Sequence, residues 1–278
     1  MLKKRVITGL WGIPLLFAAV WFDKPLPWFT VLVAIWGLLA VFEFYKLVAG
    51  TGVLPLTYFG LVWALLFILS GNSELLSILK PHFNLELLVP LLLTSAVVLS
   101  LIWLLFRRQK EGAFIGWAWT IAGILYLGWL LSYFVALRGI NEPIPDAGRN
   151  WVFLALATNF GSDTAAFFTG RALGKHHLAP SISPGKTWEG TIAGVLGAII
   201  VSLLFTILIP ISYWQAIILG LLVSIFGQFG DLVESLFKRN MGVKDSGRLL
   251  PGHGGFLDRI DSVVFAGVVV YYYAIWAI

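Results

Sequence analysis

A series of long apolar runs constrains this chain more than any other feature. The runs fall near residues 6–22, 27–48, 53–70, 86–106, 113–137, 151–170, 191–209, 214–235 and 262–278. Most approach the length of about 20 residues that a helix needs to cross a bilayer. Hydrophobic residues make up 59% and charged residues 12% of the chain, against about 45–50% and 25% in soluble domains. The sequence therefore predicts an all-α polytopic membrane protein with about nine transmembrane helices.

We expect a single integral membrane domain over residues 1–278, with N-terminal helices in 1–150 and catalytic helices and loops in 151–278. Cysteine is absent, which excludes disulfides and thiolate metal sites. The N-terminus combines a basic and an apolar region, as signal peptides do, but no small-x-small cleavage site follows. We interpret this segment as an uncleaved first span, with a cleaved signal peptide as the alternative.

Basic residues divide unevenly between the two sides of the predicted bundle. If successive loops alternate in side, only four of the 19 Lys and Arg residues fall on the second side: Lys24, Lys80, Arg138 and Arg149. Since Lys and Arg favour cytoplasmic loops, we expect a cytoplasmic N-terminus and an external C-terminus, in a bacterial inner (cytoplasmic) membrane. The membrane then explains the net charge of +5 without a nucleic acid partner. The long polar loops 171–190 and 236–261 both fall on the cytoplasmic side.

Two aspartates interrupt apolar runs. Asp163 lies in "NFGSDTAAFF" and Asp231 in "IFGQFGDLVESLF". An ionised carboxylate at membrane depth costs about 2.5–3.5 kcal/mol, so it normally faces a partner, a bundle interior or an aqueous cavity. Asn159 shares the helix face of Asp163, and three polar residues continue the face of Asp231, namely Glu234, Ser235 and Lys238. We interpret both aspartates as functional; a solvated helix end is the alternative for Glu234 and Lys238.

Charge and glycine are concentrated in residues 238–261, "KRNMGVKDSGRLLPGHGGFLDRID". Its glycines allow the backbone to approach a ligand closely. Asp258 and Asp261 share a face at the start of the last helix, and carboxylate oxygens suit Mg²⁺. With the basic residues, they are typical of phosphoryl or nucleotidyl transfer. The alternative is a basic cytoplasmic loop whose charges neutralise one another. His253 could bind phosphate, transfer a proton or make a structural hydrogen bond.

The other long loop contains "SISPGKTWEG". It is not a nucleotide P-loop, because Pro180 stands where that motif requires glycine. We expect Thr187 to cap the helix that follows, while Ser183 and Lys186 hold phosphate or ribose oxygens. A capped helix with a basic flank and no ligand is the alternative.

These residues carry a family resemblance. The run "SLFKRNMGVKDSGRLLPGHGGFLDRID", residues 235–261, resembles the signature of the phosphatidate cytidylyltransferases, also called CDP-diacylglycerol synthases. The stretches "NFGSDTAAFFTGRALGKH" and "SPGKTWEG" are also similar to this family, so the resemblance covers roughly 150–278. Gly185 departs from the pattern, where a polar or basic residue is expected, and this weakens the assignment of its backbone to a substrate contact.

The resemblance implies that the phosphate of phosphatidic acid attacks the α-phosphorus of CTP, giving CDP-diacylglycerol and pyrophosphate in a polar cleft at the cytoplasmic side. It implies a two-cation centre containing Mg²⁺, with K⁺ as the candidate second cation, and Asp231 and Asp258 as ligands. By the same resemblance the phosphate-binding residues are Lys238, Arg239, Lys244 and Arg259, and the nucleotide-binding residues are Ser183, Lys186 and Thr187. Further ligands or supporting residues are Asn159, Asp163, Glu189 and Asp261.

The expected partners are CTP, phosphatidic acid and the lipid bilayer. Whether the chain also forms a homodimer is left open. Two other functions are weighed against the synthase. A CTP-dependent lipid kinase of the dolichol kinase type would transfer the γ-phosphoryl group instead, and the intact His-Gly-Gly and Asp-Arg-Ile-Asp run argues against it. An ion-coupled membrane transporter would also bury acids, but it would not need two basic, glycine-containing loops on one side, and the chain lacks paired interrupted helices.

Overall fold

The computed structural model describes residues 2–22, 26–80, 84–107, 110–141, 144–247 and 254–277, and the side chains of these residues except 2–9, 79 and 277. It is helical apart from one short hairpin, so the all-α prediction is confirmed in outline. Six helical segments in this part of the chain are long and apolar enough to cross a membrane, namely Trp28–Gly50, Leu85–Leu105, Ala113–Arg138, Trp188–Ile207, Tyr213–Asn240 and Leu257–Trp276. The chain is therefore an integral, polytopic membrane protein.

The other three expected spans correspond to helices that are shorter or less apolar than these six. The segments Leu10–Trp21 and Thr57–Ser70 are apolar but shorter than the six. The helix Ala147–Leu173 is long enough, but its apolar sequence is broken by Asn159 and Asp163. The number of about nine transmembrane helices therefore stays a prediction.

The helices form two compact units. Unit 1 comprises residues Met1–Gly139 and Asp245–Asp258, and unit 2 comprises Ile140–Lys244 and Arg259–Ile278. The first break falls near the expected change of role at residue 150. The short segment 245–258 departs from that scheme, because it packs with the N-terminal helices although it lies deep in the C-terminal half of the sequence.

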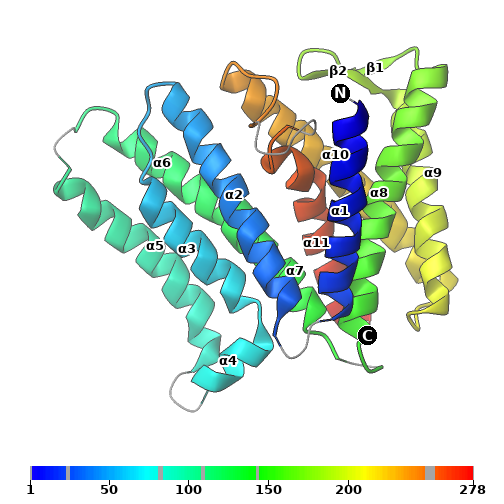
Figure 1. The fold of residues 1–278 in the computed structure, drawn as a ribbon, viewed down its shortest axis with the longest axis horizontal. Coiled ribbons are helices and arrows are strands. Elements are labelled where there is room, and N and C mark those ends of the chain that lie inside the picture. Colours follow the sequence, from blue (N-terminus) through cyan, green and yellow to red (C-terminus); the bar gives the residue numbers. More distant parts are fainter. Residues whose placement is uncertain are drawn as a thin grey trace. The chain divides into compact units, whose positions relative to one another are not determined.

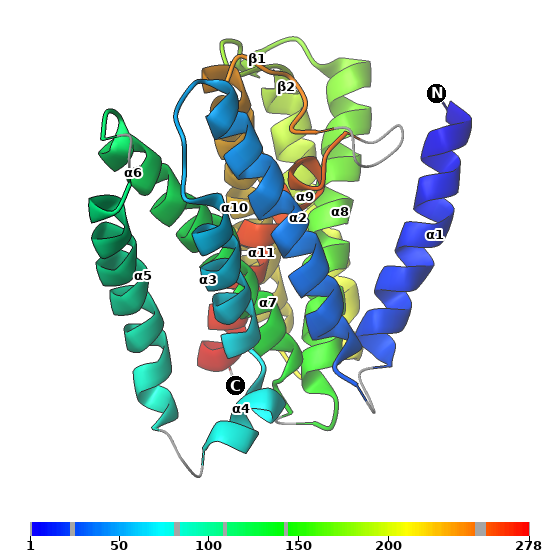
Figure 2. The same ribbon diagram turned by 60° about the vertical axis from the view of Figure 1, so that its left-hand side comes forward.

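Unit 1 is a set of helices joined by short connections. Its elements are α1 (Leu2–Trp21), α2 (Trp28–Gly50), α3 (Thr57–Ser70), α4 (Ser73–Leu79), η1 (Leu85–Leu87), α5 (Leu88–Leu105), α6 (Ala113–Gly123), η2 (Ile124–Trp129) and α7 (Leu130–Arg138). Within this unit α3 packs beside α2, as both ribbon views show (Figure 1; Figure 2). Buried polar contacts fix the packing: the Tyr45 hydroxyl donates to the Thr120 carbonyl at 2.7 Å, and the Thr120 hydroxyl oxygen accepts from Leu56 N. These contacts join α2, α6 and the segment before α3.

Unit 2 contains four long helices and the hairpin. Its elements are α8 (Ala147–Leu173), β1 (His177–Ala179), β2 (Ser183–Thr187), α9 (Trp188–Leu204), η3 (Phe205–Ile207), α10 (Tyr213–Asn240) and α11 (Leu257–Ala277), whose first two residues belong to unit 1. Helix α9 packs against α8 and α10, and α8 and α9 lie side by side in both ribbon views (Figure 1; Figure 2).

Small polar side chains join these helices where they are buried. The Ser162 and Ser224 hydroxyls are 2.7 Å apart between α8 and α10, and the Ser202 hydroxyl donates to the Ala216 carbonyl between α9 and α10. Such residues let helix backbones approach closely in a membrane and satisfy one another's hydrogen bonds.

The antiparallel hairpin was not predicted. In it β1 pairs with β2, with His177 opposite Thr187 and Ala179 opposite Ser183. The segment "SPGKT" contains proline and glycine, which strands usually avoid, so no local signal favoured a strand. The hairpin orders the loop before α9 and presents Ser183 and Lys186 from one short strand.

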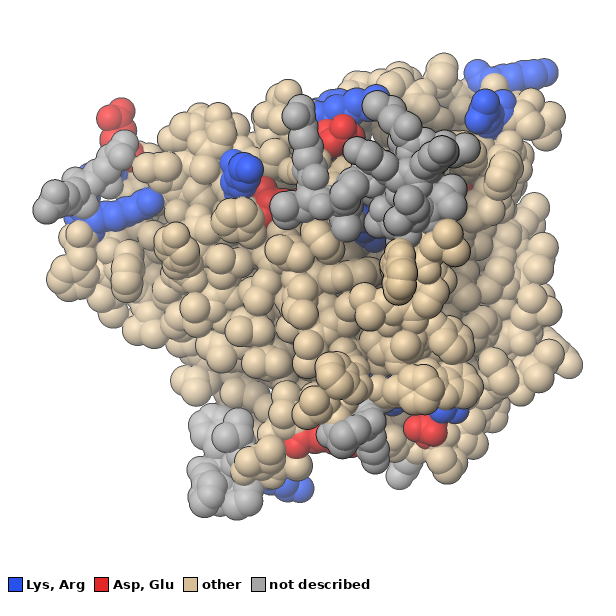
Figure 3. Space-filling model, in the orientation of Figure 1, with Lys and Arg blue, Asp and Glu red and all other residues tan. Residues whose placement is uncertain are grey.

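The charged side chains visible on one face of the protein lie away from the middles of the helices (Figure 3). On the face drawn in Figure 3, Lys, Arg, Asp and Glu gather near helix ends, and the surface between is uncharged. A helix surface that contacts lipid tails is expected to have this character.

Candidate active site

The polar stripe on α10 is ordered by pairs of its own residues. The Ser235 hydroxyl donates to Asp231 Oδ1 at 3.3 Å, and Lys238 forms an ion pair with Glu234 one turn earlier. Glu234 is completely buried and the Lys238 side chain is only 14% exposed. The alternative of a solvated helix end is therefore wrong for both residues, and the stripe is an internal polar face of α10.

Lys186 links the hairpin to this stripe. Its ammonium lies 2.8 Å from Asp231 Oδ2 and also donates to the Gln228 carbonyl at 3.3 Å. The Asp231 side chain remains 36% exposed, so other groups can reach it. Two residues that sequence analysis assigned to separate roles, nucleotide binding for Lys186 and metal binding for Asp231, are thus direct partners.

Further acids lie close to Asp231. Asp163 on α8 and Asp261 on α11 both lie near enough to Asp231 for their negative charges to repel. Asn159 Nδ2 donates to the Ser262 hydroxyl at 2.9 Å, and that hydroxyl also hydrogen-bonds Asp163. Unit 2 therefore gathers the expected residues of α8, α10 and α11 around one cluster of carboxylates.

The start of α9 matches its expected capping. The Thr187 hydroxyl oxygen accepts a hydrogen bond from Gly190 N at 3.1 Å, which confirms the predicted N-cap. Glu189, expected as a supporting residue of the nucleotide site, accepts from the His176 ring nitrogen at 2.6 Å. This contact fixes the two ends of the hairpin to each other. Ser183, on β2, is half-buried.

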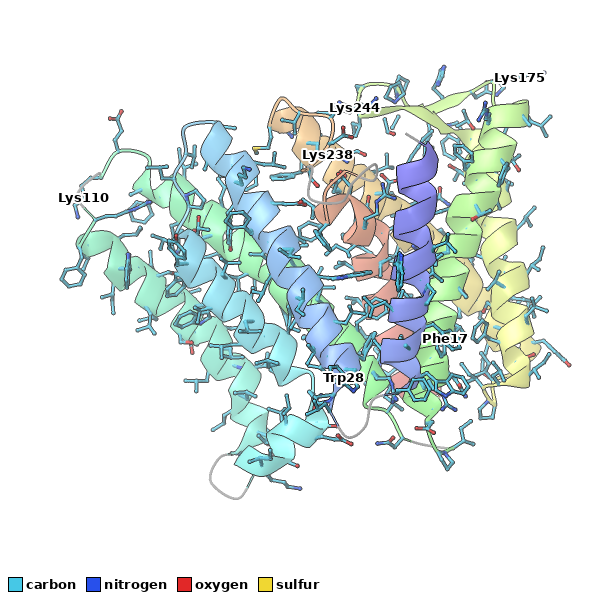
Figure 4. The ribbon with its side chains drawn as sticks, viewed as in Figure 1. Phe17, Trp28, Lys110, Lys175, Lys238 and Lys244 are labelled. Carbon is cyan, nitrogen blue, oxygen red and sulfur yellow. The ribbon has the colours of Figure 1, made fainter. Side chains whose placement is uncertain are left out.

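The basic residues after Lys238 have different surroundings. Arg239 donates to the carbonyls of Ile182 and Val243, so it joins the hairpin to the end of α10. Figure 4 shows Lys238 at the end of α10 and Lys244 on the loop that follows, and Lys244 is exposed. Arg259, in the first turn of α11, is also exposed. His253 lies outside the described residues.

Asp258 belongs to unit 1 and is held by backbone groups. Its Oδ2 accepts from Gly255 N at 2.8 Å and from Ser246 N at 3.0 Å, which closes the loop between these residues. The two expected metal ligands therefore belong to different units, Asp231 to unit 2 and Asp258 to unit 1. The contacts of each are described within its own unit.

The donors present suit a hard cation, although the described side chains do not form a ready metal cage. Among the described residues, no group of three or more His, Cys, Asp or Glu side chains lies close enough together to hold a metal ion. The charge pattern nevertheless fits Mg²⁺, because neighbouring carboxylates repel one another and their oxygens are the ligands that this ion prefers.

Sequence analysis missed two residues that complete these contacts, Gln228 and Ser262. Gln228 donates to the Ser224 hydroxyl at 3.0 Å and accepts from Lys186 through its backbone, while Ser262 joins Asn159 and Asp163. Neither residue is charged, so neither stood out in an apolar helix. Glu43 was also missed, although an acid within an apolar run is the signal that identified Asp163 and Asp231.

Comparisons with known proteins agree on one family. The cytidylyltransferase family model matches residues 3–276. The chain is 36% identical to the phosphatidate cytidylyltransferase of Bacillus subtilis over 98% of this chain and 97% of that protein, and 33% identical to the one of Synechocystis sp. over 99% and 97%. It is also 36% identical to the chloroplastic phosphatidate cytidylyltransferase 4 of Arabidopsis thaliana, over 97% of this chain and 72% of that protein. The similarity therefore includes the N-terminal helices as well as residues 150–278.

Proposed function

The chain belongs to the cytidylyltransferase family, and we propose from this that it is a phosphatidate cytidylyltransferase, which makes CDP-diacylglycerol and pyrophosphate from phosphatidic acid and CTP. The ion pair between Lys186 and Asp231 is the observation that carries the assignment to these residues. It brings a cation suited to phosphate into a cluster of carboxylates, and nucleotidyl transfer uses both kinds of group.

The lipid supplies its own nucleophile. A phosphate oxygen of phosphatidic acid is already anionic, so the reaction requires no strong general base. That oxygen forms a bond to the α-phosphorus of CTP, and the bond from this phosphorus to the oxygen bridging the β-phosphorus breaks. The work of the protein is then to align the two phosphates and to balance their charge.

The basic residues divide this work between them. Lys186 can leave Asp231 for a phosphate of CTP, because both are anionic partners for the same ammonium. Ser183 and the amides near Thr187 would hold nucleotide oxygens. Four cations are assigned to the remaining phosphate charge: Lys238, Arg239, Lys244 and Arg259. His253 keeps its three alternatives of phosphate binding, proton transfer and a structural hydrogen bond.

Asp231 and Asp258 are the proposed ligands of Mg²⁺, with K⁺ as a second cation; Asp163 and Asp261 are further candidates, and Asn159 and Glu189 support the site. When bound, a divalent cation would neutralise phosphate charge and stabilise the leaving pyrophosphate. The carboxylates on their own repel the substrates, so the proposal requires a cation beside them.

The proposed arrangement in the membrane follows from the substrates and from the basic loops. We place the enzyme in a bacterial inner membrane, with about nine spans, a cytoplasmic N-terminus and an external C-terminus. A polar cleft open to the cytoplasm would admit CTP, while phosphatidic acid would arrive through the bilayer. A homodimer stays a prediction.

One experiment distinguishes the synthase from its alternatives. Purified enzyme is incubated with phosphatidic acid and CTP labelled either at the α- or at the γ-phosphate. The synthase transfers the α-label to lipid and releases the γ-label as pyrophosphate. Label transfer from the γ-position would identify a lipid kinase instead, and no transfer from either position would favour a transporter.

A further inference from the structure

Glu43 is a buried acid in α2 that takes no part in the proposed chemistry. Its residue is only 2% exposed, and it lies within a helix apolar enough to cross a membrane. A carboxylate buried without partners is strongly unfavourable, so such residues are normally held by hydrogen bonds. The hydrogen-bond partners of Glu43 therefore indicate its role in the structure.

These partners all come from segment 245–258 of the same unit. Glu43 Oε2 accepts from the Ser246 hydroxyl at 3.1 Å and from Leu257 N at 3.0 Å, and the carboxylate also accepts from Phe256 N. Leu257 is the first residue of α11. The first N–H groups of a helix lack partners within it and carry a partial positive charge, so Glu43 caps α11 from another helix.

The loop backbone is shaped to admit this carboxylate. A Cβ atom added at Gly247 would lie 2.3 Å from Glu43 Oε1, and one added at Gly255 would lie 2.3 Å from Oε2. Two turns earlier on α2, Trp36 packs edge-on against Phe256, with ring centroids 6.2 Å apart. One face of α2 thus contacts both ends of the loop that runs from Ser246 to Phe256.

The same loop ends hold Asp258. Ser246 donates its hydroxyl to Glu43 and its backbone N–H to Asp258, while Gly255 N donates to Asp258 from the other end. The two carboxylates therefore clamp the same residue, since Ser246 donates to both of them. Any movement of Ser246 or of the first turn of α11 changes where the Asp258 carboxylate points.

We propose that Glu43 is a positioning residue, which clamps Ser246, Phe256 and the start of α11 so that Asp258 is presented to the reaction. The effect on turnover rests on the proposed role of Asp258. The clamp itself depends only on the contacts within unit 1. It gives the N-terminal helices a specific part in the reaction of the C-terminal signature.

The first test of the clamp does not depend on a measurement of enzyme activity. Hydrogen–deuterium exchange of the full-length, detergent-solubilised protein is compared for the parent, Glu43→Gln, Glu43→Ala and Ser246→Ala. The amides of residues 246, 247 and 254–257 should exchange at least tenfold faster in all three variants. Glu86→Gln makes the same chemical change at an exposed position of unit 1, and it should leave these amides unchanged.

Kinetics then separate positioning from general stability. Glu43→Gln keeps one acceptor oxygen but loses the charge, and its kcat should fall about tenfold to a hundredfold, as expected when a reacting group is displaced by about 1 Å. The KM for phosphatidic acid should stay within threefold of the parent value. A variant that was merely less stable would lose active enzyme at high temperature. Below its unfolding temperature, it would keep the kcat of the parent.

A glycine exchange tests the geometry directly. Gly247→Ala should be strongly damaging in the parent, because its methyl group meets the Glu43 carboxylate, and much less so in Glu43→Ala, where that carboxylate is gone. Gly50→Ala is the matched control, since nothing lies within 4 Å of a Cβ atom at that position of α2.

The outcomes are distinguishable. If exchange at residues 246, 247 and 254–257 is unchanged in both Glu43→Gln and Ser246→Ala, or if Gly247→Ala is equally damaging with and without Glu43, the clamp is wrong. If Glu43→Ala does not fold, the Gln and Ser246 variants still decide. Faster exchange in Glu43→Gln together with normal turnover of Asp258→Asn would keep the clamp and reject only the role of Asp258.

Discussion

The Lys186 ammonium lies 2.8 Å from a carboxylate oxygen of Asp231, so the hairpin before α9 and the polar face of α10 meet in one ion pair. The pair helps to explain how Asp231 is tolerated within a long apolar helix, because a charge at membrane depth normally has a partner. In the proposed reaction, Lys186 is the residue through which the arrival of CTP would change the charge around Asp231.

Replacing Lys186 should therefore affect the nucleotide more than the lipid. In Lys186→Ala, loss of a charge-assisted hydrogen bond worth about 1.5–3 kcal/mol should raise the KM for CTP by about tenfold or more. The KM for phosphatidic acid should change little, and steady-state kinetics with each substrate varied in turn measure both. Lys175→Ala removes an exposed lysine from the same loop as a control. Unchanged kinetics for CTP in Lys186→Ala would leave the loop as a capped helix without a ligand.

Removing either proposed metal ligand should abolish turnover without unfolding the protein. In Asp231→Asn and Asp258→Asn we expect turnover to fall by about 10² or more, as for other groups that stabilise transition-state charge. Thermal stability without Mg²⁺ should change little, because each substitution removes a repelling carboxylate but also weakens a contact: the Lys186 ion pair of Asp231, or the backbone hydrogen bonds to Asp258. Activity and thermal unfolding are measured across a Mg²⁺ titration, with Glu111→Gln as the control. Full activity of the parent in EDTA would contradict the metal site.

The buried contact between Asn159 and Ser262 should contribute to stability. In Asn159→Ala we expect a loss of about 0.6–1.7 kcal/mol, the range measured for hydrogen bonds between membrane helices. Thermal or denaturant unfolding in a lipid-like detergent measures the loss. In the double variant with Ser262→Ala, the two effects should be less than additive because both remove the same bond. Full additivity would mean that this contact contributes no coupling.

The orientation in the membrane can be tested without background because the chain has no cysteine. Lys175→Cys, on the loop before α9, should react with an impermeant thiol reagent only after the cells are opened. Ser77→Cys, on exposed α4, should react in intact cells. The reverse result at either position would contradict the proposed topology.

Much of unit 2 could be predicted because its signals are local. The i, i+3, i+4, i+7 spacing placed Asp231, Glu234 and Lys238 on one face, and Thr187 caps the helix that it precedes in sequence. The ion pair between Lys186 and Asp231 could not be predicted, because it joins residues 45 positions apart and depends on a hairpin whose sequence disfavours strands.

The contact of Glu43 with Ser246 lies still further beyond sequence patterns. It spans 203 positions, and apolar periodicity says nothing about which helix meets which loop. An acid deep within an apolar run is a signal of a functional residue, and this signal could have identified Glu43. Only the three-dimensional packing can name Ser246 and Leu257 as its partners.

The membership of segment 245–258 in unit 1 has a consequence for biosynthesis. Since a membrane protein inserts as it is translated, α2 reaches the bilayer long before Ser246 and Leu257 have been made. Until then Glu43 lies in an apolar helix without the partners that later hold it. A nascent chain that stalls, or is truncated, before residue 245 thus retains in the bilayer an acid whose hydrogen-bond donors have not yet been made.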